Sequence, residues 1–137
     1  MRYIILSVIS GLLFGILDGL INANPLAVKL YAVYQPIMRG AINAPAGILI
    51  DLIYGFAMAA IFILLYKSLP GKSGLMKGLN YGLIIWFFRV VMAAASSWMM
   101  FNVPAETLIY GLIAGLGEMV VIGLLYGLLL KGRNPSP

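Results

Sequence analysis

The sequence predicts an all-α polytopic membrane protein, a four-transmembrane-helix bundle with a short amphipathic interfacial helix between the first two spans. Its composition, its four long apolar runs and the uneven distribution of its basic residues support this fold class. Of its 137 residues, 63% are hydrophobic and 9% are charged, whereas a soluble domain has about 45–50% and about 25%. One soluble domain of this length cannot bury so much apolar surface. We therefore expect a single integral membrane domain over residues 1–137, with the lipid bilayer as its solvent.

Four apolar runs are each long enough to cross the hydrocarbon core, which takes about 20 helical residues. They cover residues of about 3–21, 44–66, 79–101 and 105–130. Asn43 and Asn102 each stand two residues before a proline, Pro45 and Pro104. In both places the asparagine can cap a helix whose first turn accommodates the proline. The first run follows Arg2 and resembles a signal peptide without a good cleavage site, so we interpret it as an uncleaved helix.

Basic residues gather on one side of the predicted membrane. On that side lie the N-terminus, the loop of about 67–77 and the C-terminus, with the residues Arg2, Lys67, Lys72, Lys77, Lys131 and Arg133. Only Lys29 and Arg39 lie on the other side. By the positive-inside rule both termini are cytoplasmic and the protein lies in the cell's inner (plasma) membrane. A membrane surface explains the net charge of +5, and no nucleic-acid partner is expected.

The segment of about 25–39 is too polar to span the membrane, and Pro36 interrupts it. Its apolar residues recur at helical spacing, which predicts an amphipathic helix lying in the outer interface. An irregular loop in the second half of the segment remains an alternative. The outer aromatic belt would consist of Tyr31, Tyr34, Trp98, Phe101 and Tyr110.

Each predicted span carries one ionisable residue: Asp18, Asp51, Arg89 and Glu118. A charge at the bilayer centre costs about 2.5–3.5 kcal/mol on insertion scales, and small residues share its helix face in every span. The charges should therefore point inward. Arg89 and Glu118 lie at nearly equal distances from the turn between the last two spans and should be level. Asp51 should lie about one turn outward, and Asp18 near the outer end.

This ion cluster has two interpretations. It could form a binding site for an ion or polar solute, open to the outer side. Alternatively, Arg89 and Glu118 could simply tie two helices together, with Asp51 as a second acceptor for the guanidinium. Trp86, one turn from Arg89, would either stack on it or face lipid.

Glycines at four-residue spacing permit close helix contact within one chain or between chains. The stripes comprise Gly11, Gly15 and Gly19, then Gly111 and Gly115, then Gly123 and Gly127. These three stripes are more than the packing of a single four-helix bundle needs. Expected partners are therefore the bilayer and either a second copy of the chain or other membrane subunits.

The chain has no cysteine and no histidine, which excludes disulfides and zinc–thiolate sites and removes the commonest general base. No nucleophile–base pair, metal-ligand spacing or phosphate-binding loop is present, so we expect neither an enzyme nor a cofactor or metal. The leading hypothesis is transport or permeation of a small ion or polar solute through Asp18, Asp51, Arg89 and Glu118. A structural or assembly subunit of a larger membrane complex is the main alternative. A receptor or lipid binder, based on segment 25–39 alone, is a third.

Overall fold

The computed structural model describes residues 1–130, and within that range it is helical, without strands. It contains four helices long and apolar enough to cross a membrane, as the sequence predicts for a multi-pass membrane protein. These are α1 (Arg2–Ala23), α3 (Ala44–Leu65), the continuous run Gly74–Met100 and α6 (Ala105–Leu129). The run Gly74–Met100 is divided into α4 (Gly74–Trp86), a π-helical turn η2 (Phe87–Val91) and α5 (Met92–Met100).

The helix starts follow local capping. Asn43 caps α3, and its side chain accepts a hydrogen bond from the Ala46 amide at 3.2 Å. The expected cap by Asn102 is wrong, because α6 begins after Pro104 without a side-chain cap. Two of the basic residues used to predict the orientation, Lys131 and Arg133, lie outside the described residues.

The third span begins earlier than predicted, at Gly74 instead of about residue 79. Ser73 caps it, and its hydroxyl accepts a hydrogen bond from the Met76 amide at 3.2 Å. Lys77 therefore lies in the first turn of α4. Its ammonium reaches back to donate to the Tyr66 carbonyl at 2.5 Å and lies 4.6 Å from the centre of that ring. A long lysine side chain that snorkels in this way can be mistaken for a loop charge.

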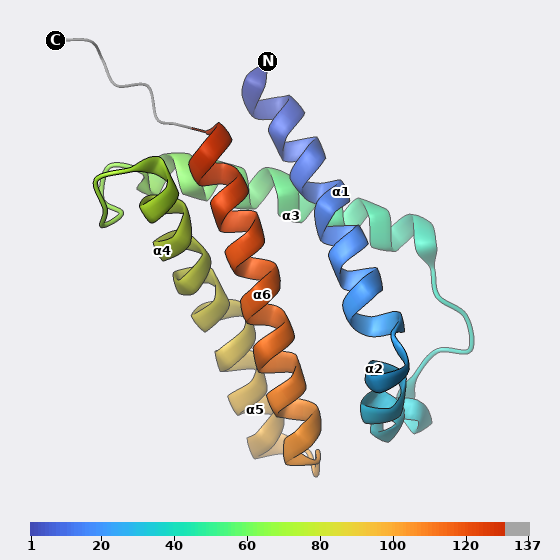
Figure 1. Cartoon of the computed structure of the whole chain (residues 1–137). Helices are drawn as coiled ribbons and strands as arrows, with labels where there is room; N and C mark the ends of the chain where they lie inside the picture. The colour runs from blue at the N-terminus through green and yellow to red at the C-terminus, as the bar shows by residue number, and fades with distance from the viewer. Residues whose placement is uncertain (131–137) are drawn as a thin grey trace, which may run out of the picture.

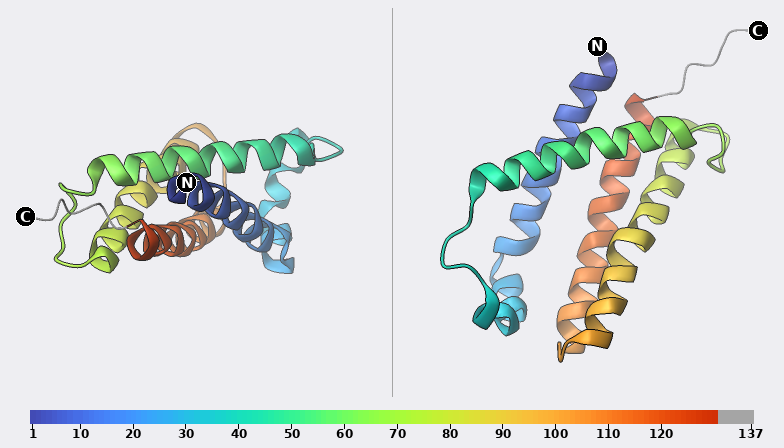
Figure 2. Two further views of the ribbon diagram at one scale, coloured as in Figure 1. Left: turned by 90° about the horizontal axis from the view of Figure 1, so that it is seen from above. Right: turned by 180° about the vertical axis from the view of Figure 1, so that it is seen from behind.

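The helices are arranged as two closely packed pairs, α1 with α3 and α4 with α6, joined by contacts between α1 and α6. Three of these four candidate spans, α1, the α4–α5 run and α6, extend in broadly similar directions (Figure 1). Helix α3 lies across them, as both further views show (Figure 2). Because α3 packs mainly on α1, it does not stand beside α4 as it would in a simple up-and-down bundle.

Glycines permit the closest contacts in both pairs. A Cβ on Gly78 of α4 would collide with the carbonyl oxygen of Gly123 on α6, and a Cβ on Gly123 would collide with that of Gly78. In the other pair, a Cβ on Gly55 of α3 would collide with the backbone of Gly11 on α1. Much of the small-residue surface is thus used within the chain, which weakens the argument for a second copy.

Aromatic rings and hydroxyl groups hold α3 against α4 and α6. Phe62 lies between Tyr81 and Tyr126, with ring centres 5.2 and 5.7 Å away, and all three side chains are fully buried. The Tyr81 hydroxyl donates to the Met58 carbonyl at 2.7 Å, and the Tyr126 hydroxyl donates to Ser10 Oγ at 2.8 Å. Each buried phenol therefore has a hydrogen-bond partner, as an apolar surrounding requires.

The segment after α1 folds back onto α6. It contains a short helix, α2 (Pro25–Leu30), and a 3₁₀ helix, η1 (Tyr31–Ile37), in place of one amphipathic helix over 25–39. Asn24 caps α2 by accepting from the Ala27 amide at 3.0 Å, and Thr107 Oγ1 donates to the Leu30 carbonyl at 2.9 Å. The second half of the segment is helical as far as Ile37, so the irregular loop is not found there. Its position in the membrane interface stays a prediction.

Candidate functional site

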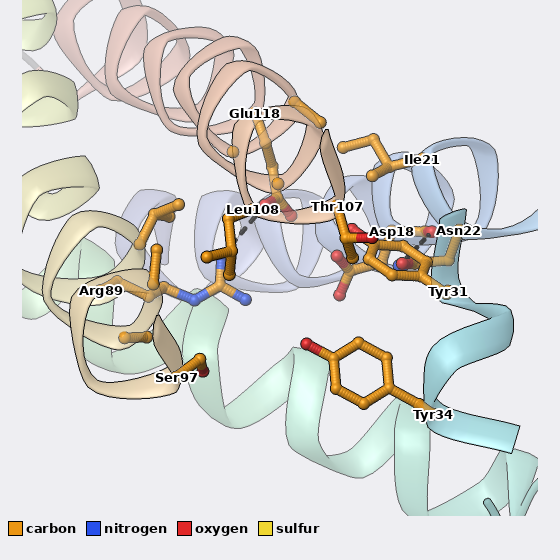
Figure 3. A pocket seen from close by; sticks show the side chains of 16 residues that line it. Asp18, Ile21, Asn22, Tyr31, Tyr34, Arg89, Ser97, Thr107, Leu108 and Glu118 are labelled. Carbon is orange, nitrogen blue, oxygen red and sulfur yellow. Dashed lines mark hydrogen bonds and ion pairs between the residues drawn. The ribbon is translucent and has the colours of Figure 1, made fainter. Parts of the chain in front are cut away.

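A cavity of about 310 Å³ lies between α1, η1, the α4–α5 run and α6 (Figure 3). Its polar lining comprises Asp18, Asn22, Tyr31, Tyr34, Arg89, Ser97, Thr107 and Glu118. Small and apolar side chains, among them Val90, Ala93 and Gly115, complete the wall. Three of the four ionisable residues singled out in the sequence thus share one cavity.

The centre of the site is an ion pair between Arg89 and Glu118. The Arg89 Nη1 donates to Glu118 Oε2 at 3.1 Å, and the two side chains are 27% and 4% exposed. It is the only ion pair in the part of the chain that the structure describes. The contact agrees with the equal heights inferred from the hairpin, and it joins the third and fourth spans.

Arg89 lies in the π-helical turn, which the sequence did not predict. Such turns often occur at functional sites because one extra residue changes the direction of the side chains that follow. The guanidinium carbon lies 4.9 Å from the centre of the Tyr54 ring on α3 and 5.4 Å from that of Phe14 on α1. Stacking on two aromatic rings stabilises the cation and holds it at the cavity wall, level with Glu118.

Only one of the two carboxylate oxygens of Glu118 has a hydrogen-bond partner. Its Oε1 atom is buried and has no hydrogen-bond partner within residues 1–130. A buried acceptor without a donor is costly and rare in folded proteins. The same carboxylate lines the cavity. A donor inside the cavity would therefore complete its hydrogen bonding.

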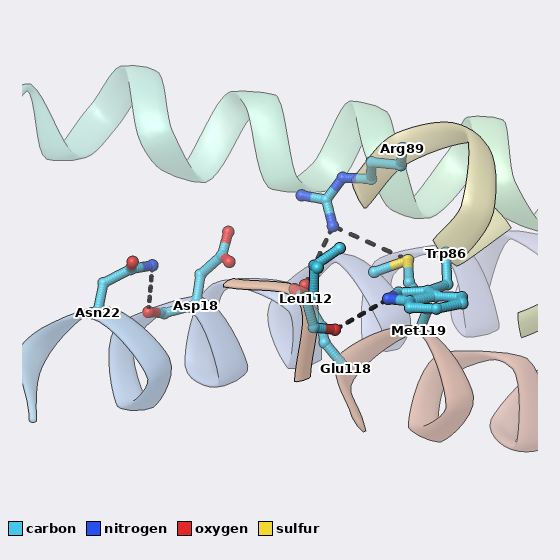
Figure 4. Close-up of polar contacts among 7 residues, drawn as sticks. All are labelled: Asp18, Asn22, Trp86, Arg89, Leu112, Glu118 and Met119. Atoms are coloured by element: carbon cyan, nitrogen blue, oxygen red, sulfur yellow. Dashed lines mark hydrogen bonds and ion pairs between the residues drawn. The ribbon is translucent and has the colours of Figure 1, made fainter. Parts of the chain in front are cut away.

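Asp18 contributes a second carboxylate on the α1 side of the cavity (Figure 4). Its backbone carbonyl accepts from Asn22 Nδ2 at 2.8 Å, whereas its carboxylate forms no ion pair with any described residue and lies within hydrogen-bonding reach of the Glu118 carboxylate. Asp18 is half-buried. Asp18, Arg89 and Glu118 together give this cavity a formal charge of −1, since two acids face one base.

Asp51 lies elsewhere. It lines a separate groove of about 340 Å³ between α1 and α3, together with Gly11, Gly15 and Gly47. It makes no ion pair or hydrogen bond with Arg89, so its predicted role as a second acceptor for the guanidinium is wrong. The physical reason is the course of α3, which crosses α1 instead of standing beside α4. Gly15 leaves space for this carboxylate, because a Cβ there would come within 2.8 Å of Asp51 Oδ2.

Trp86 neither stacks on Arg89 nor lies free in lipid. Its indole Nε1 donates to the Leu112 carbonyl at 2.9 Å, and the residue is half-buried (Figure 4). This bond fixes the end of α4 against α6, immediately before the π-helical turn. It thereby positions the backbone that carries Arg89.

Three tyrosines expected in the aromatic belt lie around the cavity, and their place in the belt stays a prediction. Tyr31 and Tyr34 line it, and Tyr110 packs edge-on against Tyr31 with ring centres 5.8 Å apart. The Tyr110 hydroxyl donates to the Ile21 carbonyl at 2.6 Å and accepts from Asn24 at 2.8 Å. Burial, followed by the neighbouring Tyr110, Tyr34 and Asp18, raises the pKa of Tyr31 above 10.0. Tyr31 is therefore a neutral phenol that can donate a hydrogen bond.

Comparison with known proteins gives no match to any family model, curated protein or solved structure. Conclusions about function therefore rest on the geometry of the chain itself. Within residues 1–130, no three potential metal ligands of the His, Cys, Asp or Glu type come together. The arrangement offers two carboxylates and a held guanidinium around a polar space, which suits the binding of a charged or hydrogen-bonding solute.

Proposed function

We propose that the protein carries a small ion or polar solute across the membrane through the cavity that contains Asp18, Arg89 and Glu118. The observation that supports this proposal best is the unpartnered Glu118 Oε1 atom in a polar cavity among helices that are long and apolar enough to cross a membrane. A structural ion pair gains most when every buried oxygen is satisfied. A buried carboxylate with one unpartnered oxygen beside a cavity suits the binding of an exchangeable ligand better than a purely structural role.

The proposed orientation places both termini in the cytoplasm and the cavity toward the outer side. Asp18 lies close to the end of α1, and the tyrosines of η1 follow shortly after it in the chain. In this orientation a solute entering from outside meets Asp18 before Arg89 and Glu118. Intramembrane charges on such a path are typical of ion and solute transport.

Reconstitution into liposomes tests the proposal. Fluxes of protons, Na⁺, K⁺ and small organic solutes are compared between protein-containing and protein-free vesicles. We expect the protein to increase at least one flux and the variants Glu118→Gln and Asp18→Asn to reduce it. Glu106→Gln is the matched control, because Glu106 is exposed in the first turn of α6 and does not line the cavity. Fluxes equal to those of protein-free vesicles for the whole panel would refute the proposal.

A second candidate is a structural or assembly subunit of a larger membrane complex. It is favoured by glycines at which an added Cβ would meet no atom within 4 Å, among them Gly19, Gly47 and Gly117. Gly47 lies in the α1–α3 groove, where a helix of another subunit would fit closely. If this candidate is correct, a partner chain should co-purify from native membranes and be lost in Gly47→Leu. Stable isolation of the chain alone, together with a flux in liposomes, would contradict it.

A further inference from the structure

We propose that the cavity binds a small organic cation with N–H donors, of the primary ammonium type. This inference deepens the proposed function, since it names the class of solute that the Asp18–Arg89–Glu118 cavity would carry. It rests on three properties of the cavity, namely its free acceptors, its charge and its size.

Two carboxylates bring acceptors to the cavity that receive no hydrogen bond from a described N–H or hydroxyl group. Glu118 is 5% exposed, and its Oε1 has no donor among the described residues. The Asp18 carboxylate likewise receives no hydrogen bond from a described N–H or hydroxyl group. A carboxylate has no proton to donate, so it needs N–H or O–H groups from the ligand. A primary ammonium carries three such donors and could serve both acids.

Charge selects a monovalent cation. Glu118 is partly neutralised by Arg89 at 3.1 Å, and the guanidinium is held by its stacking on Tyr54 and Phe14. The second carboxylate, Asp18, has no cationic partner of this kind among residues 1–130. One positive charge therefore makes the cavity neutral. An anion would meet two carboxylates, and a neutral solute would leave the charge of the half-buried Asp18 without a cationic partner.

The cavity is much larger than a bare ion needs. A water molecule needs about 10–15 Å³ of such space, whereas this cavity measures about 310 Å³. Pockets for small organic molecules start at about 300 Å³. The rings of Tyr31 and Tyr34 and the side chain of Val90 offer apolar surface for a short carbon chain. The aromatic faces can also attract a cation.

Titration calorimetry on the full chain in detergent tests this inference with butylammonium as the probe. Three compounds of similar size isolate the required features: butanol lacks the charge, butyrate reverses it, and tetramethylammonium has the charge without N–H donors. We expect one butylammonium per chain, bound about tenfold or more tightly than any of the three, since hydrogen bonds to charged groups carry that order of affinity. Equal binding of tetramethylammonium or butanol would overturn the inference.

Variants locate the binding. Asp18→Asn should weaken butylammonium binding about tenfold or more, by the same charge-assisted hydrogen bonding. Because Asp18 is half-buried near a helix end, this variant should keep its helical circular dichroism even if Glu118→Gln does not. Asp51→Asn is the matched control, a carboxylate in another span that lines the separate α1–α3 groove. If Asp51→Asn weakened binding as much as Asp18→Asn, or if Asp18→Asn had no effect, the inference would be wrong.

The failures of the two proposals can be distinguished. Butylammonium binding without any flux in liposomes would refute transport and support the ligand class. A flux of protons or alkali cations without butylammonium binding would overturn the ligand class and leave transport standing. Binding of a zwitterion such as 4-aminobutyrate about tenfold more tightly than butylammonium would also overturn it. The free N–H groups of Arg89 would then bind the ligand's carboxylate, and the ligand class would not be a simple cation.

Discussion

A methyl group at Gly123 should destabilise the protein by forcing α4 and α6 apart. In Gly123→Ala the new Cβ would lie 2.9 Å from the Cα and amide nitrogen of Gly82, and still closer to the carbonyl oxygen of Gly78. All three neighbours are backbone atoms, so no side-chain rotation can relieve the clash. Overpacking of this kind typically costs about 1–3 kcal/mol.

Gly117→Ala on the same helix is the control, because a Cβ there would meet nothing within 4 Å. Both substitutions give the same increase in helix propensity, about 1 kcal/mol. The difference between their unfolding free energies therefore isolates the clash. We expect Gly123→Ala to be about 1–3 kcal/mol less stable than Gly117→Ala, as measured by SDS titration in mixed micelles and followed by circular dichroism. Equal stability of the two variants would refute the close backbone contact between α4 and α6.

Two further predictions concern buried polar groups. Arg89→Met should cost about 3–5 kcal/mol of unfolding free energy, because it leaves the Glu118 carboxylate buried and unpaired. The double variant Arg89→Met with Glu118→Gln should recover much of that loss in the same micelle titration, and a double variant no more stable than the single one would contradict the pairing. Tyr126→Phe should lower the thermal midpoint by removing the hydroxyl that donates to Ser10 Oγ at 2.8 Å, a loss of about 1–2 kcal/mol. Tyr54→Phe, on an exposed residue, should change it less.

The parts of the fold that could be predicted depend on local sequence. The lengths of the apolar runs predict the four candidate spans, and the prolines near Ala44 and Ala105 mark two helix starts. The contact of Arg89 with Glu118 was also predictable, because a short turn between antiparallel helices fixes their relative height.

Other features depend on packing between distant segments. The crossing of α3 over α1 follows from the fit of Gly55 against Gly11, and this fit moves Asp51 out of the cavity. The π-helical turn at Arg89 is a backbone irregularity without a residue pattern of its own. The contacts of Tyr81 and Tyr126 had one signal in the sequence, a phenol within an apolar span that must find a hydrogen-bond partner.

Thiol labelling of single-cysteine variants tests most directly whether Asp18, Arg89 and Glu118 share a water-filled cavity reached from outside. The chain contains no cysteine, so each introduced thiol is the only one. Ala93 lines the cavity, whereas Met92, the neighbouring residue at similar depth, is 49% exposed on another face of α5 and does not line it. A charged, membrane-impermeant thiosulfonate requires water and a thiolate. We expect outside reagent to label Ala93→Cys but not Met92→Cys, and butylammonium to slow that labelling. An unlabelled Ala93→Cys, or equal labelling of both variants, would contradict the cavity.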